Sequence, residues 1–259
     1  MNAEPHPEDL LDGIRDLARR AGEVILDIYR TDFKVRRKSD SSPVTEADEA
    51  AERVILPVLR ALTPAIPVIA EEEAAAGRIE SLSGDYFWLV DPLDGTKEFI
   101  AGNDEFTVNI ALIHAARPVL GVVYAPVLDA MYAGAGPGTA SLQAADAARR
   151  SIAARAVPES GAIMISSRSH GDPDSLAELT ESLHVSGHRI AGSSLKFCLV
   201  AAGEADIYPR YGPTHEWDTA AGDAVLRAAG GSVRTLDGVD LRYGKDRFLN
   251  PRFIARGLD

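Results

Sequence analysis

An apolar run near the middle of the chain, Phe87-Trp-Leu-Val, ends in two carboxylates in the segment Asp91-Pro-Leu-Asp94-Gly-Thr96. Proline restricts the residue before it to extended backbone, so Asp91 is expected to continue a strand. Asp-Gly favours a turn, and residues 95–99 suit the first turn of a helix whose free N–H groups face the carboxylates. Carboxylate oxygens suit Mg²⁺ and helix N–H groups suit a phosphate, which indicates metal-assisted phosphate chemistry. Taken alone, the segment is better explained by a turn with Asp94 as a helix N-cap, because Asp is favoured at turns and caps for local reasons.

Further acidic residues lie at the ends of other expected elements. Glu71 directly follows an apolar run and therefore lies at a second strand end. Asp218 begins a helix that stops at a pair of glycines, and an N-cap role would explain it on its own. Thr45-Glu-Ala-Asp48 fits the capping-box pattern that begins many helices. Each segment has a local explanation, but four acidic segments at element ends favour a common site.

Five motifs occur in one order along the chain, and together they resemble signatures of the Mg²⁺-dependent, lithium-sensitive inositol monophosphatase superfamily. Their details are most similar to those of the CysQ type, the 3′(2′),5′-bisphosphate nucleotidases, a group tied to sulfur assimilation. The resemblance covers about residues 10–254. The motifs are Asp91-Pro-Leu-Asp-Gly-Thr-Lys-Glu-Phe99, Glu105-Phe-Thr-Val-Asn-Ile-Ala-Leu112, Ser166-Ser-Arg-Ser-His170, Gly192-Ser-Ser-Leu-Lys-Phe197 and Trp217-Asp-Thr-Ala-Ala-Gly222.

The resemblance implies two Mg²⁺ ions in the site, with a third, weaker one possible near Thr45 and Asp48. Two ions about 4 Å apart can activate a water and stabilise the leaving oxygen of a phosphoryl displacement. The implied ligands are the side chains of Glu71, Asp91, Asp94 and Asp218 and the backbone carbonyl of Leu93. One departure is Ala70, where relatives often carry Ser or Gly. In the run of three glutamates Glu71 matches the family's metal position, and the other two suit a solvated loop.

The same resemblance assigns catalytic roles. Glu71 is the expected proton acceptor, and Thr96 holds the attacking water with it. Thr45 and Asp48 are expected to lie close by and to hydrogen-bond Thr96, and Asp94 completes the catalytic set. The backbone N–H groups of Gly95 and Thr96 are expected to hold the phosphate.

Substrate choice depends on a second group of residues. Relatives that act on inositol carry a glutamate near position 210 that binds sugar hydroxyls, whereas this chain has Arg210 there. Lys196 adds a cation, and Ser193 and Ser194 add hydroxyl donors. Asp218 is the last residue expected to bind substrate. Arg and Lys bind phosphate through charge-assisted hydrogen bonds, so these residues suit a substrate with two phosphates. The alternative for Lys196 and Arg210 is a solvated surface.

The function expected from the resemblance is a Mg²⁺-dependent phosphomonoesterase. It would convert 3′-phosphoadenosine 5′-phosphate to AMP and phosphate, with 3′-phosphoadenylyl sulfate as a second substrate. An inositol-1-phosphate or sugar-phosphate phosphatase of the same superfamily is the first alternative. A catalytically silent metal- or nucleotide-binding protein is the second, although every expected ligand side chain is present.

Composition excludes several classes of protein. The 259 residues contain 27 Lys and Arg against 39 Asp and Glu, a net charge of −12, which disfavours nucleic-acid polymers because binding them requires clustered positive charge. A single cysteine, Cys198, excludes an intramolecular disulfide and suits a core thiol. We expect no secretory leader, no transmembrane segment and a cytoplasmic protein, with no sign of attraction to the inner membrane. Monomer and homodimer both stay open.

These residues must be positioned by alternating helices and strands. Apolar periodicity predicts the helices, with Pro57 kinking or ending the second one, and a hairpin joins two of the strands. The expected helices are 8–30, one beginning after 45, 175–183, 194–202 and 219–229, and the expected turn is 39–43. The expected strands are 33–37, 67–70, 86–90, 108–114, 119–124, 162–166, 205–209 and 232–235.

This alternation predicts an α/β protein, and the resemblance makes it a layered αβαβα sugar-phosphatase sandwich. We expect an α+β N-terminal half, residues 1–145, that carries most metal ligands. An α/β C-terminal half, residues 146–259, would carry Asp218 and the substrate contacts. A soft boundary between 135 and 160 follows from the glycine- and alanine-rich composition there.

Overall fold

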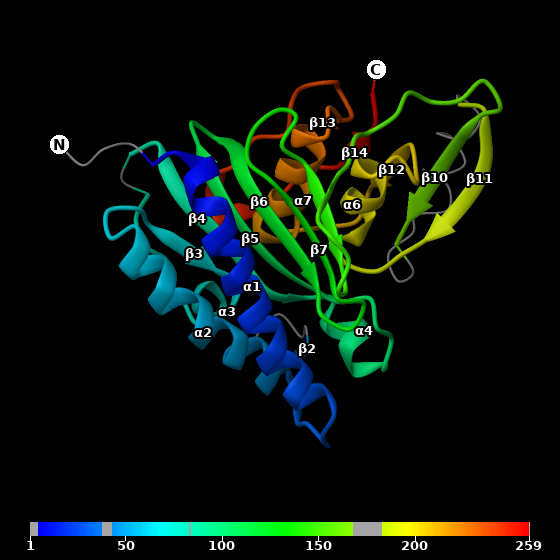
Figure 1. The fold of residues 1–259 in the computed structure, drawn as a ribbon. Coiled ribbons are helices and arrows are strands. Elements are labelled where there is room, and N and C mark those ends of the chain that lie inside the picture. The colour runs from blue at the N-terminus through cyan, green and yellow to red at the C-terminus, as the bar shows by residue number, and fades with distance from the viewer. Residues whose placement is uncertain (1–4, 38–42, 83, 168–182, 259) are drawn as a thin grey trace.

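The computed structural model describes residues 5–37, 43–82, 84–167 and 183–258. Two β-sheets and their helices form stacked layers (Figure 1). The helix expected over 175–183 and the turn expected over 39–43 lie outside the described residues, apart from one end residue each, and so does His170.

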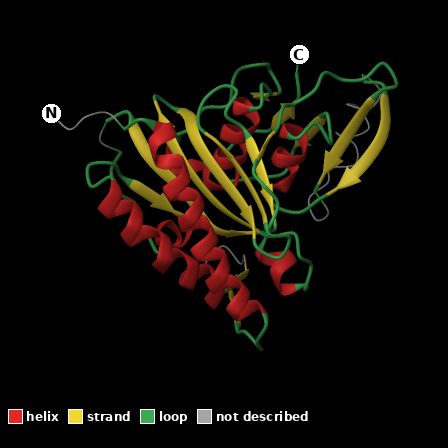
Figure 2. Cartoon of the chain, in the orientation of Figure 1, coloured by secondary structure: helices red, strands yellow, loops and turns green. Residues whose placement is uncertain are grey.

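The first layer consists of two long helices on the outer face of the larger sheet (Figure 2). They are α1 (Pro7–Tyr29) and α2 (Glu46–Leu62). Two short paired strands, β1 (Val35–Arg37) and β2 (Pro43–Thr45), come before α2. The expected helix over 8–30 is confirmed, and so is the capping box at Thr45. Pro57 does not end α2, which continues to Leu62 because its buried face packs against the sheet on both sides of the proline.

The larger sheet has seven strands in sequential order. Its strands are β3 (Val68–Ala70), β4 (Tyr86–Asp94), β5 (Thr107–His114), β6 (Arg117–Ala125), β7 (Ala130–Gly134), β8 (Ser141–Ala144) and β9 (Arg150–Ser151). The β3 and β4 strands are parallel, and every other pair is antiparallel. The hairpin of β5 and β6 is therefore confirmed, whereas β7–β9 were not predicted.

The smaller sheet has the order β11-β10-β12-β14-β13. Its strands are β10 (Ala162–Ser166), β11 (Val185–Ile190), β12 (Ile207–Arg210), β13 (Ser232–Thr235) and β14 (Phe253–Arg256). The remaining helices are α3 (Glu71–Ala75), α4 (Thr96–Ile100), α6 (Leu195–Ala201), α7 (Glu216–Ala228) and the 3-10 turn η1 (Asp246–Phe248). Prediction missed β11 and β14 and placed the start of α7 three residues late.

The layers follow the order helices, sheet, helices, sheet across the described residues. Side chains of β4 alternate between the two sides: Trp88 and Val90 pack with α1 and α2, while Phe87 and Leu89 belong to the core around α6 and α7. Burial on both faces explains why this strand is an unbroken apolar run. The expected α/β class is confirmed. One core extends from the larger sheet to the smaller one, and the division at 145 stays a prediction.

Helix α7 lies between the sheets and packs unusually close to β6 and α6. A Cβ at Gly121 of β6 would be 2.3 Å from the carbonyl oxygen of Ala221, and a Cβ at Gly222 would be 2.6 Å from the ring of Phe197 on α6. Real Cβ atoms do not approach other atoms so closely, so both positions require glycine. Since α7 carries Asp218, these two contacts determine how far the Asp218 carboxylate lies inside the protein.

We predict that Gly121→Ala destabilises the protein by about 1–3 kcal/mol, because a methyl group there forces α7 away from the sheet. The matched control is Gly13→Ala on α1, where nothing lies within 4 Å of an added Cβ. Removing a glycine from a helix interior there is expected to stabilise by about 0.5–1 kcal/mol. Urea unfolding measures both, and effects of equal sign would contradict the packing argument.

Candidate active site

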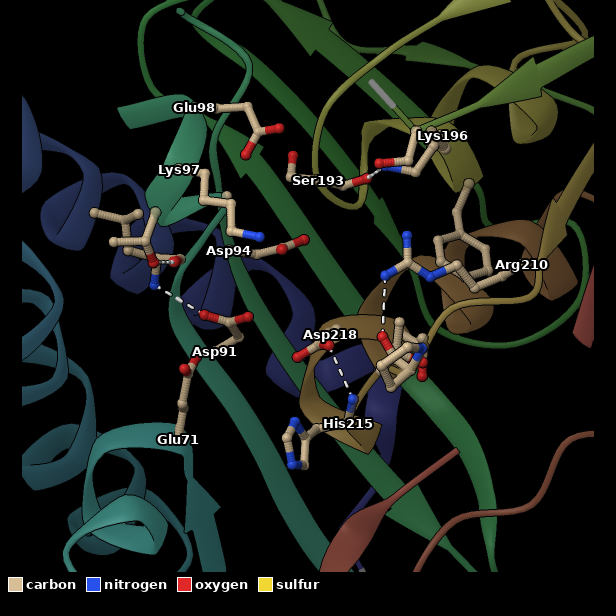
Figure 3. Close-up of a pocket in the computed structure, with 18 of the residues that line it drawn as sticks. Glu71, Asp91, Asp94, Lys97, Glu98, Ser193, Lys196, Arg210, His215 and Asp218 are labelled. Atoms are coloured by element: carbon tan, nitrogen blue, oxygen red, sulfur yellow. Dashed lines mark hydrogen bonds between the residues drawn. The ribbon is translucent and has the colours of Figure 1, made fainter. Parts of the chain in front are cut away.

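A cavity of about 250 Å³ opens where the two sheets meet, at the carboxyl end of β4 (Figure 3). Most of the expected site residues line it, from segments far apart in the sequence. They are Glu71, Asp91, Leu93, Asp94, Gly95, Thr96, Ser193, Lys196, Arg210 and Asp218. Asp48 and Ser194 do not line the cavity but hydrogen-bond Thr96 and Asp94, which do, and Thr45 is bonded to Asp48 one step further from the cavity.

Glu71 and Asp91 are neighbours because they follow paired parallel strands. Ala70, the last residue of β3, is in register with Val90 of β4. The next residue of each strand is therefore an acid at the same sheet edge. Glu71 also begins the short helix α3, so the acidic run is not the solvated loop that was expected. That expectation is wrong because Glu73 forms an ion pair with Arg60 of α2, with 2.7 Å between Oε2 and Nη2.

Asp91 and Asp94 face the cavity together because β4 contains a bulge between them. Asp91 pairs with Asn109 and Asp94 with Thr107, so β4 has one residue more than β5 in this interval. Two residues three apart on a regular strand would point to opposite faces. The extra residue reverses the alternation, and Leu93 consequently packs on the α1 and α2 side. The bulge places both acids on the side of α7.

Asp218 reaches the cavity from the first turn of α7. His215 is the N-cap, and Asp218 Oδ2 accepts a hydrogen bond from the His215 N–H at 2.9 Å. Asp218 is thus the third helical residue and not the N-cap, as the sequence alone had allowed. The His215 ring stacks on Trp217 with centroids 4.6 Å apart and also lines the cavity, which its isolated position in the sequence did not suggest.

A chain of hydrogen bonds runs from the cavity into the helical layer. Thr96 Oγ1 donates to Asp48 Oδ1 at 3.2 Å and lies 3.4 Å from the Leu93 carbonyl oxygen. Asp48 Oδ2 accepts from both the N–H and the Oγ1 of Thr45, each at 2.7 Å. The expected hydrogen bond between Thr96 and Asp48 is present, whereas Thr45 is linked to Thr96 only through Asp48. The capping box of α2 therefore also fixes the Thr96 hydroxyl.

A second network holds Asp94 and was not predicted. Asn109 Nδ2 lies 3.3 Å from Asp94 Oδ2 and 2.8 Å from Ser194 Oγ, which is itself 3.0 Å from Asp94 Oδ2 and 2.7 Å from the Asp218 carbonyl oxygen. Asn109 is buried, and Thr107 Oγ1 donates to its Oδ1 at 3.0 Å. A polar residue at a core-facing position of β5 was the available sequence signal. Ser194 therefore links the two halves of the site.

The carboxylates strongly perturb one another. Burial, followed by the charges of Glu71, Asp94 and Asp218, raises the pKa of Asp91 well above its usual range. Burial and the charges of Asp94 and Glu71 do the same to the pKa of Asp218. Burial also raises the pKa of Asp94, although Lys196, Ser194 and Asn109 oppose the change. Like charges gathered in one cavity are stable together only with a proton or a cation among them.

This donor set fits Mg²⁺, which prefers oxygen ligands and keeps several waters, with only one or two carboxylates needed. Among the described residues, no three His, Cys, Asp or Glu side chains are grouped closely enough to hold one metal ion between them. An open arrangement of acids with the Leu93 carbonyl nearby is compatible with such a hydrated ion. Glu71, Asp91, Asp94 and Asp218 are the side chains that would hold it.

Two buried cations lie across the cavity from Glu71 and Asp91 (Figure 3). Lys196 Nζ donates to the carbonyl oxygens of Ala191 and Ser193, and burial lowers its pKa to about 8. Arg210 donates to the carbonyl oxygens of Gly212 and Pro213 at 3.2 and 3.0 Å. The alternative of a solvated surface is wrong for both residues, because the loops 191–193 and 212–213 enclose them.

The fold and the site define a layered α/β protein with an acidic pocket that also contains buried basic residues. A model of the inositol monophosphatase family matches residues 6–257. The 3′(2′),5′-bisphosphate nucleotidase CysQ of Salmonella typhimurium (strain LT2) is 49% identical over 247 residues, covering 94% of this chain and 98% of that protein. The chain therefore belongs to the inositol monophosphatase family.

Solved structures agree with this assignment. CysQ from Bacteroides thetaiotaomicron, a bacterial member of the family, is 37% identical with a TM-score of 0.79, covering 96% of this chain and 97% of its own. Inositol monophosphatase from Anabaena (Nostoc) sp. PCC 7120 is 28% identical with a TM-score of 0.76, covering 97% and 91%. The expected likeness to the CysQ type is confirmed. In the described part of the chain, no helix is both long and apolar enough to span a membrane.

We predict that Asp91→Asn stabilises the metal-free protein and removes its thermal response to MgCl₂. Eliminating one of several repelling buried charges favours the folded state, and a gain of about 1 kcal/mol corresponds to about 2–4 °C in Tm at this chain length. Wild-type protein should gain stability from millimolar MgCl₂, because a ligand that binds only the folded state raises Tm.

Differential scanning calorimetry with and without MgCl₂ makes the measurement. Asp85→Asn, an exposed acid at the start of β4, is the control and should keep the full response to MgCl₂. An unchanged response in Asp91→Asn would remove this residue from the metal-binding set.

Proposed function

We propose that the protein is a Mg²⁺-dependent phosphomonoesterase that removes the 3′-phosphate of 3′-phosphoadenosine 5′-phosphate, giving AMP and phosphate. The observation that carries the proposal is one cavity in which the carboxylates of Glu71, Asp91, Asp94 and Asp218 face the buried cations Lys196 and Arg210. A substrate with two phosphates has an anion for each side. Relatives named 3′(2′),5′-bisphosphate nucleotidase, at up to 49% identity over nearly the whole chain, support the same assignment.

Mg²⁺ held by Glu71, Asp91, Asp94, Asp218 and the Leu93 carbonyl would supply an activated water and offset the charge on the phosphate. The chain's own groups then position the reactants. Thr96 Oγ1, fixed by Asp48, orients the attacking water, and Glu71 accepts its proton. Backbone N–H groups of Gly95 and Thr96, at the start of α4, hold the phosphate oxygens. Two metal ions, with a weaker third, are the expected number.

Support for Thr96 comes from its hydrogen bonds. Asp48 accepts a hydrogen bond from Thr45 with Oδ2 and one from Thr96 with Oδ1. The Thr96 O–H bond is therefore directed toward Asp48. The lone pairs of Thr96 Oγ1 then face away from Asp48 and can accept a hydrogen bond from a water in the cavity. Thr45 and Asp48 thus act through Thr96 and not on the substrate.

The substrate's second phosphate is assigned to the side of Arg210 and Lys196. Lys196 already donates to two backbone carbonyls, which leaves one of its three donors for a ligand. Arg210 uses Nε and Nη2 within the protein, and its guanidinium lines the cavity. Ser193 adds a hydroxyl at the cavity, whereas Ser194 supports Asp94. The sulfated analogue, 3′-phosphoadenylyl sulfate, has the same charge pattern and is the second proposed substrate.

An inositol-phosphate phosphatase is the second candidate function, because a solved inositol monophosphatase has the same fold. That substrate has no second anion for Arg210 and Lys196, and burying these cations without one is costly. The complete carboxylate set disfavours a silent binding protein. A cytoplasmic location and inhibition by lithium stay predictions from the sequence.

Phosphate release with Mg²⁺ tests the proposal, using 3′-phosphoadenosine 5′-phosphate, inositol 1-phosphate and fructose 1,6-bisphosphate at equal concentration. We expect a preference for the nucleotide of about a hundredfold in kcat/KM, about 2.7 kcal/mol of transition-state stabilisation. Faster release from inositol 1-phosphate would keep the metal chemistry and reject the nucleotide. No phosphate release from any of the three substrates would reject the proposal that the protein is a phosphatase.

We predict that Arg210→Gln lowers kcat/KM for the bisphosphate by about 10–100-fold, since charged hydrogen bonds contribute about 1.5–3 kcal/mol. Its rate on inositol 1-phosphate should change far less, because that substrate offers no second anion. Arg189→Gln is the matched control, an exposed arginine on the edge strand β11 that is paired with Glu204. Equal losses on both substrates would assign Arg210 to loop structure instead.

A further inference from the structure

One carboxylate of the cavity is used neither by the expected metal set nor by the protein. Glu98, the third residue of α4, is 9% exposed and lines the cavity. Within the described residues its carboxylate makes no hydrogen bond or ion pair, in contrast to Glu105, whose Oε2 accepts from the Gly192 N–H at 2.8 Å. A nine-tenths buried carboxylate without a partner is costly, so it marks a place for a donor.

A hydroxyl beside it has the same property. Ser193 Oγ is buried and, among the described residues, has no hydrogen-bond partner. The Ser193 backbone is in the left-handed region with φ 41°, which is unusual for a residue other than glycine. Lys196 holds the Ser193 carbonyl oxygen, and this contact keeps the turn in place. The strained turn therefore presents a hydroxyl that nothing in the described protein uses.

The two groups lie together on one side of the cavity (Figure 3). Gly192 brings them close: a Cβ there would lie 3.1 Å from Glu98 Cγ and 2.5 Å from the Glu105 carbonyl oxygen. The absence of a side chain at 192 thus lets the 191–194 turn pack against α4. We call Glu98 and Ser193 the acceptor corner.

An ionised carboxylate accepts hydrogen bonds only, while a serine hydroxyl can donate and accept. A phosphate does not fit the acceptor corner, because two anions would repel. A ligand hydroxyl fits it, donating to Glu98 and accepting from Ser193 at the same time. Thr96 and Glu98 both belong to the short helix α4 and both line the cavity, so such a hydroxyl would be attached near the phosphate that Thr96 faces.

We propose that Glu98 and Ser193 recognise a hydroxyl group on the carbon next to the one that carries the scissile phosphate. The proposal rests on the proposed function, in which this group is the ribose 2′-hydroxyl of a nucleoside 3′,5′-bisphosphate. The acceptor corner then determines specificity for ribose over deoxyribose. It acts through binding of a neutral group, beside Lys196, which donates to the Ser193 carbonyl oxygen and is assigned to the second phosphate.

The test uses 3′-phosphoadenosine 5′-phosphate, also written as adenosine 3′,5′-bisphosphate, and compares its kcat/KM with that of its 2′-deoxy analogue. Wild-type protein should prefer the ribose form by at least about tenfold, because a site that binds a substrate hydroxyl discriminates against its absence. Glu98→Met removes the acceptor at similar volume and should reduce the preference to about twofold or less. Glu98→Gln keeps an acceptor oxygen and should retain part of the preference. Ser193→Ala gives the same readout independently if Glu98→Met folds poorly.

Asp104→Asn is the control, an exposed acid just beyond α4 that accepts from Tyr29 and does not line the cavity. It should keep the wild-type preference. A preference that is absent in wild-type protein, or unchanged in both Glu98→Met and Ser193→Ala, would overturn the proposal. A third substrate, inosine 3′,5′-bisphosphate, lacks the exocyclic amine of adenine and tests whether the corner recognises the base. If the variants change discrimination against inosine and not against deoxyribose, the corner recognises the base and the hydroxyl assignment is wrong.

Failure of the proposed function is recognised separately, since wild-type protein would then not hydrolyse adenosine 3′,5′-bisphosphate at all. In that case the same ratio is measured on inositol 1-phosphate and its analogue deoxygenated next to the phosphate. A ratio that falls in Glu98→Met supports the acceptor corner for a different polyol. A ratio that stays constant overturns it.

Discussion

Repulsion among four carboxylates is the constraint on which the site depends. Asp91, Asp94, Asp218 and Glu71 each raise the free energy of at least one other as an anion, and the fold must hold them together regardless. It does so with elements that are fixed elsewhere: a strand buried on both faces and a helix pressed against Gly121. Apolar packing far from the cavity therefore offsets the electrostatic cost in it, and a bound cation would reverse the sign of that cost.

Neutral donors make the hydrogen bonds that the described residues show to Asp94 and Asp218. Ser194 and Asn109 hydrogen-bond Asp94, and the His215 N–H does so for Asp218. An arginine in those positions would hold the acids equally well but would cancel the negative potential that attracts a metal ion. The buried ammonium of Lys196 donates to backbone carbonyls instead, and only through its charge does it oppose the rise in the Asp94 pKa. The site is thereby ordered without being neutralised.

How far sequence analysis succeeds depends on how local the signal is. The strand before Asp91, the turn at Gly95 and the capping box at Thr45 are encoded within a few residues, and each was predicted. The edge strands β9 and β11 are short or exposed and lack alternation, so they were missed. The bulge that turns Asp94 to the same side as Asp91, and the partners of Asn109, depend on strand register, which only the assembled sheet defines.

The two halves of the chain supply opposite charges to one cavity. Three of the four clustered acids come from β4 and the end of β3, whereas Lys196, Arg210 and the Ser193 turn belong to α6, β12 and the segment before α6. Only Asp218 crosses this division, and Ser194 joins it to Asp94. On the proposed function, metal binding would depend mainly on the first set of residues and recognition of the second phosphate on the second set. A single family fold could in this way keep its phosphate chemistry while residues near the smaller sheet contact the rest of the substrate.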